Sequence, residues 1–317
     1  MGALAQLAPE VISLDAVRKI IVPIRDSSKE TYEAHFNSFV KFIKKRNGSN
    51  KFKLSEIVEY FNFLANRGFK SSTLKGIRSA LRDPLKLYFP TFDIVSDYCI
   101  RNIIKYVKCH SKQITYRFPA WDLNLVIRML KFRDCKDIQF WLKKVLFLAF
   151  IACPFRIGEF NSISLSASVF SPVHIMLKTH ITFLSKNETD TSTKNPIVIP
   201  EYSEDPDICP VKLLNQYVRW SKSKCRELGI ARPDKFWINL NGKPLSVNTM
   251  RKWIKEVIFL GDPNASGSLK VHSVRGQVAS HLHSSGLSVK EVMMAMSWRN
   301  ESTFKKFYSR LGISTAV

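Results

Sequence analysis

Residues 272–308 read HSVRGQVASHLHSSGLSVKEVMMAMSWRNESTFKKFY. Near the start of this stretch, His272 and Arg275 are three positions apart, so a helix would carry both side chains on one face. There the two cations could meet one phosphate group. A His-x-x-Arg pattern also arises by chance in a chain with 7 histidines, so the pattern is weak when taken alone.

The end of the same stretch predicts a terminal helix over Glu301–Leu311, with Asn300 as its cap. Tyr308 lies on the apolar stripe of this helix, with its hydroxyl at the edge of the stripe. Trp298, just before the cap, could anchor a local core. The simplest interpretation is that Trp298 and Tyr308 both pack in the protein core. A tyrosine hydroxyl at the surface is also a possible nucleophile.

An earlier motif, PFRIGEF, begins at Pro154 and follows an apolar helix predicted over Ile138–Ile151. The proline ends that helix, and Arg156 and Glu159 then share one face of a new turn. The guanidinium could offer two parallel donors to a phosphate while the carboxylate holds it in place. A surface Arg–Glu pair at a helix start is the simpler interpretation of the motif by itself.

A polar hairpin is predicted over 186–195, between the two motifs. A lysine on such a hairpin could reach a bound substrate and protonate a departing oxygen. Lys186 and Lys194 are equally placed for this role, and lysine is also an ordinary residue of exposed turns.

Taken in order, these residues are Arg156, Lys186, His272, Arg275, Trp298 and Tyr308. This set resembles the catalytic residues of the tyrosine recombinases (the lambda integrase family), and residues 272–308 are most similar to the Cre-type end of that family. Trp298 follows Arg275 at a family-like interval, whereas Tyr308 comes one residue later after Trp298 than is usual. A weaker resemblance, to recombinases of DIRS-like retroelements and Cryptons, lies in the motif PAWDLN from Pro119 to Asn124.

The resemblance implies a nucleophile and a phosphate clamp. Tyr308 would attack the scissile phosphate and form a 3′-phosphotyrosine, while Arg156 and Arg275 would bind the non-bridging oxygens. The covalent link would conserve the energy of the broken bond. Neither ATP nor a metal ion is therefore expected, and no cofactor is predicted.

The remaining roles are also implied by the resemblance. Lys186 would protonate the 5′-oxygen, and His272 would assist removal of the tyrosine proton. Trp298 would pack and hydrogen-bond at the phosphate, and Glu159 would orient Arg156. Members of the family act as tetramers on DNA, so the resemblance implies that this chain forms a homotetramer on double-stranded DNA.

The charge of the chain agrees with a nucleic-acid partner. Its 49 Lys and Arg against 26 Asp and Glu give a net charge of +23, and a surplus of this size favours a polyanion as partner. A basic protein that binds nucleic acid only non-specifically would have the same surplus. The 6 cysteines are scattered without a CxxC pair, which argues against a disulfide scaffold or a zinc site.

At 317 residues the chain is long enough for two domains. After an N-terminal tail (1–24), residues 25–112 show only helical patterns and resemble the SAM-like core-binding domain of the family. Residues 113–317 resemble its catalytic domain, and both halves are basic. The predicted fold is therefore mainly α with a small antiparallel β-sheet (α+β), arranged as a two-domain clamp around DNA.

The sheet is predicted from three short alternating stretches, Val173–Leu177, Ile181–Leu184 and Ile197–Ile199. The longest apolar stretch, Val145–Phe155, is too short to cross a bilayer. Residues 1–24 lack a secretory signal, so an intracellular protein is expected, nuclear if the host is eukaryotic.

Two other functions fit the same residues. A type IB topoisomerase uses the same tyrosine chemistry, although the helical first half and the Cre-like end favour a recombinase. A DNA-binding protein that descends from a mobile element and no longer cuts DNA is an alternative from another class.

Overall fold

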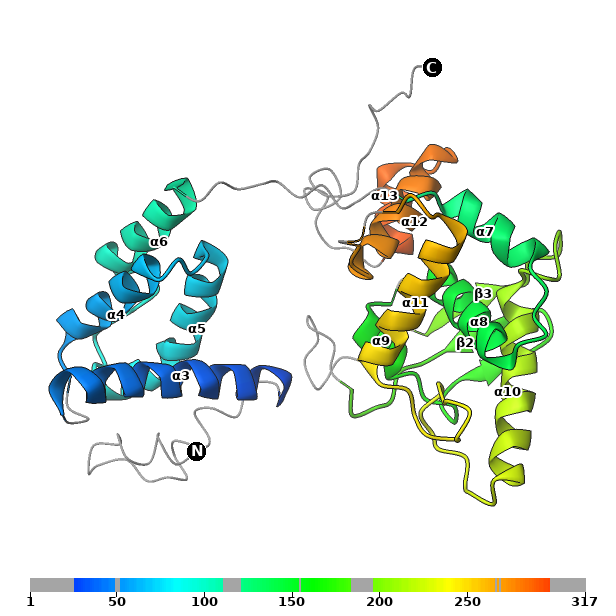
Figure 1. Ribbon diagram of the computed structural model, residues 1–317, viewed down its shortest axis with the longest axis horizontal. Helices are drawn as coiled ribbons and strands as arrows, with labels where there is room; N and C mark the ends of the chain where they lie inside the picture. Colours follow the sequence, from blue (N-terminus) through cyan, green and yellow to red (C-terminus); the bar gives the residue numbers. More distant parts are fainter. Residues whose placement is uncertain are drawn as a thin grey trace. The chain divides into compact units, whose positions relative to one another are not determined.

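A computed structural model describes residues 26–48, 52–110, 121–153, 155–183, 196–265, 267 and 269–296 (Figure 1). The chain divides into two compact units, Met1–Thr115 and Tyr116–Val317. The large buried cluster of the first unit shares no residue with that of the second, so each unit has a core of its own. Within the described residues the fold is mainly helical with one small antiparallel sheet, which confirms the predicted fold class.

The first unit contains four described helices, which are α3 (Asp26–Asn47), α4 (Leu54–Asn66), α5 (Ser71–Tyr88) and α6 (Tyr98–His110). Helix α3 packs mainly on α5, and α4 packs mainly on α6. Their apolar faces meet in a core rich in aromatic rings. Phe39 is fully buried there, in edge contact with Tyr60 at a centroid distance of 5.2 Å.

The second unit is built around α8 (Ile138–Ala152), which is buried along most of its length. Helices α10 (Pro210–Glu227) and α11 (Val247–Gly261) both pack on α8, and α11 also packs on α7 (Leu123–Phe132). A helix that is apolar on most sides needs such partners on several faces. Figure 1 shows α8 inside this unit with α10 at its outer edge.

The sheet has the strand order β1 (Val169–Phe170), β2 (His174–Leu177), β3 (Ile197–Pro200), and both pairings are antiparallel. Ile175 and Leu177 point into the core from β2, with their side chains fully buried. The predicted strands Val173–Leu177 and Ile197–Ile199 are therefore present, displaced by about one residue.

The predicted strand Ile181–Leu184 is wrong in its described part, residues 181–183. The chain turns there, because the amide of Phe183 donates to the carbonyl of His180 at 2.9 Å. Ile181 is 92% exposed and has no strand beside it, so its apolar character never contributes to the core. The third strand of the sheet is β1 instead. This strand is too short to show an alternating pattern in the sequence.

Three further helices complete the described part of the second unit, namely α9 (Ile157–Asn161), α12 (His272–Ser284) and α13 (Val289–Ala295). The terminal helix predicted over Glu301–Leu311 lies outside the described residues. None of the helices in the described ranges is long and apolar enough to span a membrane.

Helices α7 and α11 approach each other closely at Gly261. A Cβ atom built on this glycine would lie 2.6 Å from Cα of Val126, a backbone atom that cannot rotate away. We expect Gly261→Ala to lower the free energy of unfolding by about 1–3 kcal/mol through overpacking, measured by urea denaturation.

Gly76 supplies the matched control, because it also lies within a helix and a Cβ there would meet nothing within 4 Å. Gly76→Ala should raise stability by roughly 0.5–1 kcal/mol, since alanine loses less conformational freedom in a helix. Equal effects of the two substitutions would show that the contact at Val126 is unimportant.

Candidate active site

Arg156 is held by Glu159 at the start of α9. One carboxylate oxygen of Glu159 accepts the backbone N–H of Arg156 at 2.7 Å, and the other accepts the Nη1 donor of its guanidinium at 3.0 Å. Glu159 is 9% exposed, whereas the side chain of Arg156 is 37% exposed. The carboxylate thus fixes the arginine from the protein side, and the guanidinium keeps an accessible edge for an anion.

Helix α9 has only five residues, so its position depends on packing. Asn161, at its last position, is 8% exposed and donates through Nδ2 to the carbonyl of Leu245 at 2.7 Å and to Sδ of Met250 at 3.1 Å. Phe160 is fully buried against Phe150 of α8. These contacts fix α9, and therefore Arg156, to α8 and α11.

Arg275 lies on α12 and is 4% exposed. Its Nη2 donates to the carbonyl of Met296 at 2.6 Å, at the end of α13. The neighbours Val274 and Gly276 are buried, and α12 packs on α8. The guanidinium is thus oriented by two helices, and its charge lies in a poorly hydrated environment where it acts strongly on neighbouring groups.

His272 is the first residue of α12 and is exposed on part of its surface. Burial of the rest of the ring lowers its pKa below the ordinary value of 6.5, and the positive charges of Arg275 and then Arg156 lower it further. The imidazole is therefore neutral at pH 7 and keeps one nitrogen as a proton acceptor.

Cys153, just after α8, lies within reach of both halves of the site. Its thiol is buried, which raises its pKa to about 12, while Arg275 acts to lower this value and Glu159 to raise it. A buried neutral thiol is a poor nucleophile, so Cys153 is not a candidate for the attacking group.

The fold thus brings together four of the residues predicted from the sequence, which are Arg156, Glu159, His272 and Arg275. The guanidiniums of Arg156 and Arg275 carry two positive charges, and the carboxylate of Glu159 carries one negative charge. The site therefore has a net positive charge beside the neutral imidazole of His272. This arrangement suits a phosphate diester, because the cations can bind its oxygens and the imidazole can accept a proton. Lys186, Lys194, Trp298 and Tyr308 lie outside the described residues.

Two supporting groups were not predicted from the sequence, the side chain of Asn161 and the carbonyl of Met296. A carbonyl is common to every residue and gives no signal in a sequence. Asn161 gives a faint one, because it is a polar residue between Phe160 and Ile163, both of which are fully buried.

No protein-family model matches the chain, and no curated protein sequence does. Solved structures do match. A lambda integrase tetramer bound to a Holliday junction is 14% identical, with a TM-score of 0.58 over 99% of this chain and 83% of the integrase. A Tn1549 transposon integrase in complex with circular intermediate DNA is 11% identical, with a TM-score of 0.60 over 92% of this chain and 93% of that one.

A third similar structure is the XerH site-specific recombinase bound to its palindromic difH substrate. It is 14% identical, with a TM-score of 0.59 over 88% of this chain and 75% of that one. The chain therefore has the fold of the tyrosine recombinases, which confirms at the level of the fold the resemblance seen in its sequence.

Proposed function

We propose that this chain is a DNA recombinase that cuts and rejoins strands through a covalent bond between Tyr308 and the 3′-phosphate. The observation that carries the proposal is that the positive charges of Arg156 and Arg275 both act on His272, on a fold shared with recombinases. These cations come from two motifs far apart in the sequence.

The proposed reaction is a transesterification. The phenol oxygen of Tyr308 attacks the phosphorus atom, the bond to the 5′-oxygen breaks, and a phosphotyrosine forms. Arg156 and Arg275 stabilise the charge on the non-bridging oxygens. His272, neutral in the free protein, accepts the phenol proton.

The other groups complete the cycle. Lys186, or Lys194 in its place, donates a proton to the departing 5′-oxygen, and Trp298 packs at the phosphate. Glu159 is a positioning residue that holds Arg156. Attack of a 5′-hydroxyl on the phosphotyrosine reverses the step and joins the strand, with the number of phosphoester bonds unchanged.

The biological setting belongs to the same proposal. Exchange between two duplexes needs paired cuts, so four copies of the chain act together on DNA. The protein serves the movement of a mobile element, and it acts inside the cell, in the nucleus of a eukaryotic host.

Covalent trapping tests the proposal. The protein is mixed with suicide duplexes from the DNA that flanks its own gene, whose short cleaved end diffuses away, and is then denatured. We expect a protein–DNA adduct that survives denaturation. Binding without an adduct on every duplex would identify a DNA-binding protein that does not cut. Relaxation of supercoils without a recombinant product would identify a topoisomerase.

The lowered pKa of His272 predicts a pH dependence. As the pH falls through this pKa, which lies below 6.5, the ring gains a proton and loses its acceptor nitrogen. Cleavage at subsaturating DNA should then slow by about tenfold per pH unit.

The control for this pH dependence is His272→Gln, which cannot titrate. Its cleavage should be slow at every pH and should lack the acidic limb. If the limb persists in this variant, another group accepts the proton.

A further inference from the structure

Helix α13 is attached to the rest of the second unit by a small core of its own. Three buried side chains form this core, which are Ala279 of α12, Val292 of α13 and Met296. None of the three belongs to the large buried cluster around α8. Helix α13 packs mainly on α12. The position of α13 therefore depends on a few apolar contacts and not on the main core.

The outer side of α13 faces solvent. Val292 is fully buried, whereas every other residue of the helix is at least partly exposed, Met294 by 72%. The start of the helix is fixed locally, because the amide of Ser288 donates to Oε2 of Glu291 at 2.8 Å and Oγ of Ser288 accepts the amide of Glu291 at 3.3 Å. Removal of apolar atoms at Val292 would thus loosen the contact with α12 and leave this cap intact.

The position of α13 determines what Arg275 can bind. The last carbonyls of a helix have no partner within the helix. The carbonyl of Met296, directly after α13, accepts the Nη2 donor of Arg275 at 2.6 Å. The side chain of Met296 is 3% exposed and belongs to the small core, so a displacement of this core also displaces the acceptor.

Arg275 acts in turn on His272, three residues earlier on α12. Burial is the largest cause of the lowered pKa of His272, and the charge of Arg275 is the next, ahead of that of Arg156. A guanidinium that loses its fixed place becomes better hydrated, and its effect on a neighbouring group weakens. The pKa of His272 thus reports on the state of Arg275 in the absence of DNA.

We propose that Val292 and the carbonyl of Met296 are positioning groups for strand cleavage, because the contact of α13 with α12 holds the guanidinium of Arg275 in the orientation that a phosphate requires. The proposal rests on the proposed function for the phosphate alone, since the hydrogen bond is present in the free protein. Neither group takes part in the chemistry. Both act through Arg275.

The test is the pKa of His272 in Val292→Ala, measured by NMR titration of the histidine Cε1–H signals of the full-length protein without DNA. The signal is assigned by its absence in His272→Gln. We expect the pKa to rise toward 6.5, because the charge of Arg275 is no longer held in place. Cleavage of a suicide duplex should slow by about 10–10²-fold, since a displacement of about 1 Å in a catalytic group can have an effect of that size.

Val211→Ala is the matched control. Val211 is also fully buried, but it lies on α10 and belongs to the large cluster around α8. The substitution removes the same two carbon atoms, and both the pKa of His272 and the cleavage rate should stay as in the parent protein. Equal changes in the two variants would show a general loosening of the unit and overturn the proposal.

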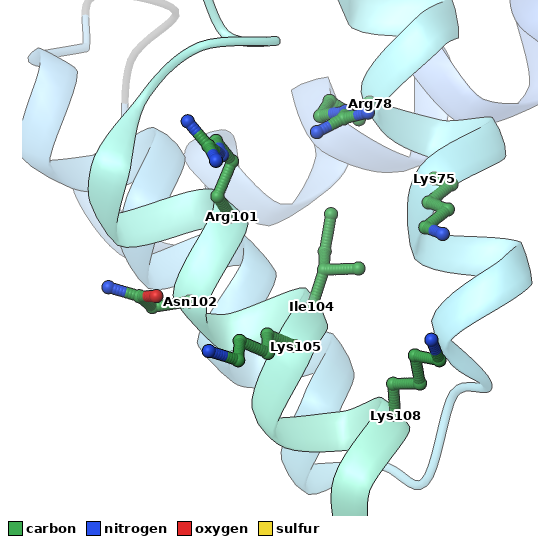
Figure 2. A pocket seen from close by; sticks show the side chains of 7 residues that line it. All are labelled: Lys75, Arg78, Arg101, Asn102, Ile104, Lys105 and Lys108. Carbon is green, nitrogen blue, oxygen red and sulfur yellow. The ribbon is translucent and has the colours of Figure 1, made fainter.

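Arg275→Gln separates the orientation of the arginine from any shielding of the ring by α13. Without the guanidinium, Val292→Ala should leave the pKa of His272 unchanged, and a further rise in the double variant would overturn the proposal. Arg101→Gln is the control for the loss of a positive charge as such. Arg101 is exposed on α6 at a pocket of the first unit (Figure 2), so its loss should not affect this pKa.

The pKa and the cleavage rate give separate results. A raised pKa in Val292→Ala, in a protein that never forms an adduct, supports the role of α13 and sinks the proposed recombinase. An adduct together with an unchanged pKa does the reverse, even if cleavage is slower, because α13 would then act through another group. Circular dichroism with a thermal melt verifies that each variant is folded, and if Arg275→Gln is not, the comparison of Val292→Ala with Val211→Ala decides.

Discussion

A Tyr308→Phe variant is expected to bind DNA as tightly as the parent protein and to form no covalent adduct at all. The substitution removes one oxygen atom and leaves the aromatic ring and the charge unchanged. Without the phenol oxygen no ester bond to phosphorus can form, so the loss is complete rather than partial. The measurement is the shifted protein–DNA band after denaturation, read beside an anisotropy titration of the same samples.

Tyr98→Phe is the control for this experiment. Tyr98 is 79% exposed at the start of α6, in the unit that contains none of the candidate active-site residues. Removal of its phenol oxygen should not affect formation of the protein–DNA adduct. An adduct that persists in Tyr308→Phe would assign the nucleophile to another residue. Mass spectrometry of the DNA-linked peptide would then identify it.

Arg275→Lys should reduce the rate of strand cleavage by about 10²–10³ while DNA affinity changes little. Lysine keeps the positive charge but has a single ammonium in place of a planar fork. In the structure the guanidinium already donates to the carbonyl of Met296, so orientation is part of its role. An ammonium cannot bind that carbonyl and two phosphate oxygens with the same geometry.

The loss of this buried hydrogen bond also affects folding, by about 1–3 kcal/mol. Cleavage is therefore measured well below the melting temperature of the variant, with Arg128→Lys as the control. Arg128 is exposed on α7, where the same exchange should change neither rate nor stability. A cleavage rate within threefold of the parent would remove Arg275 from the proposed phosphate clamp.

The fold was largely predictable from the sequence because its helices are amphipathic. In α5, for example, Leu74, Ile77 and Leu81 recur at helical spacing, and all three are buried. Short strands carry much less information. The apolar residues from Ile181 onward alternate like a strand, yet Ile181 faces solvent and no described strand of the sheet pairs with it.

In the candidate site, contacts between residues close together in the sequence could be predicted. The tertiary contacts that hold these residues in place could not. The spacing of three between Arg156 and Glu159 predicted their contact correctly, because both lie on one helical turn. The burial of Arg275 depends on how α12 packs on α8, and the anchoring of α9 depends on a carbonyl far along the chain. Such contacts are set by tertiary packing, which the spacing of residues in a motif does not specify.

The bond from Asn161 to Leu245 joins positions 84 residues apart, and this separation has a consequence during protein synthesis. At elongation rates of about 5–20 residues per second, Asn161 leaves the ribosome roughly 4–17 s before its acceptor. Throughout that interval the short helix after Arg156 can pack on α8 through Phe160 and Phe150, but it lacks its hydrogen bond to Leu245. A chain released early, before Leu245 is made, would therefore carry Arg156 without one of the contacts that fix it in place. The proposed phosphate clamp of Arg156 and Arg275 can therefore form only after most of the chain has been made.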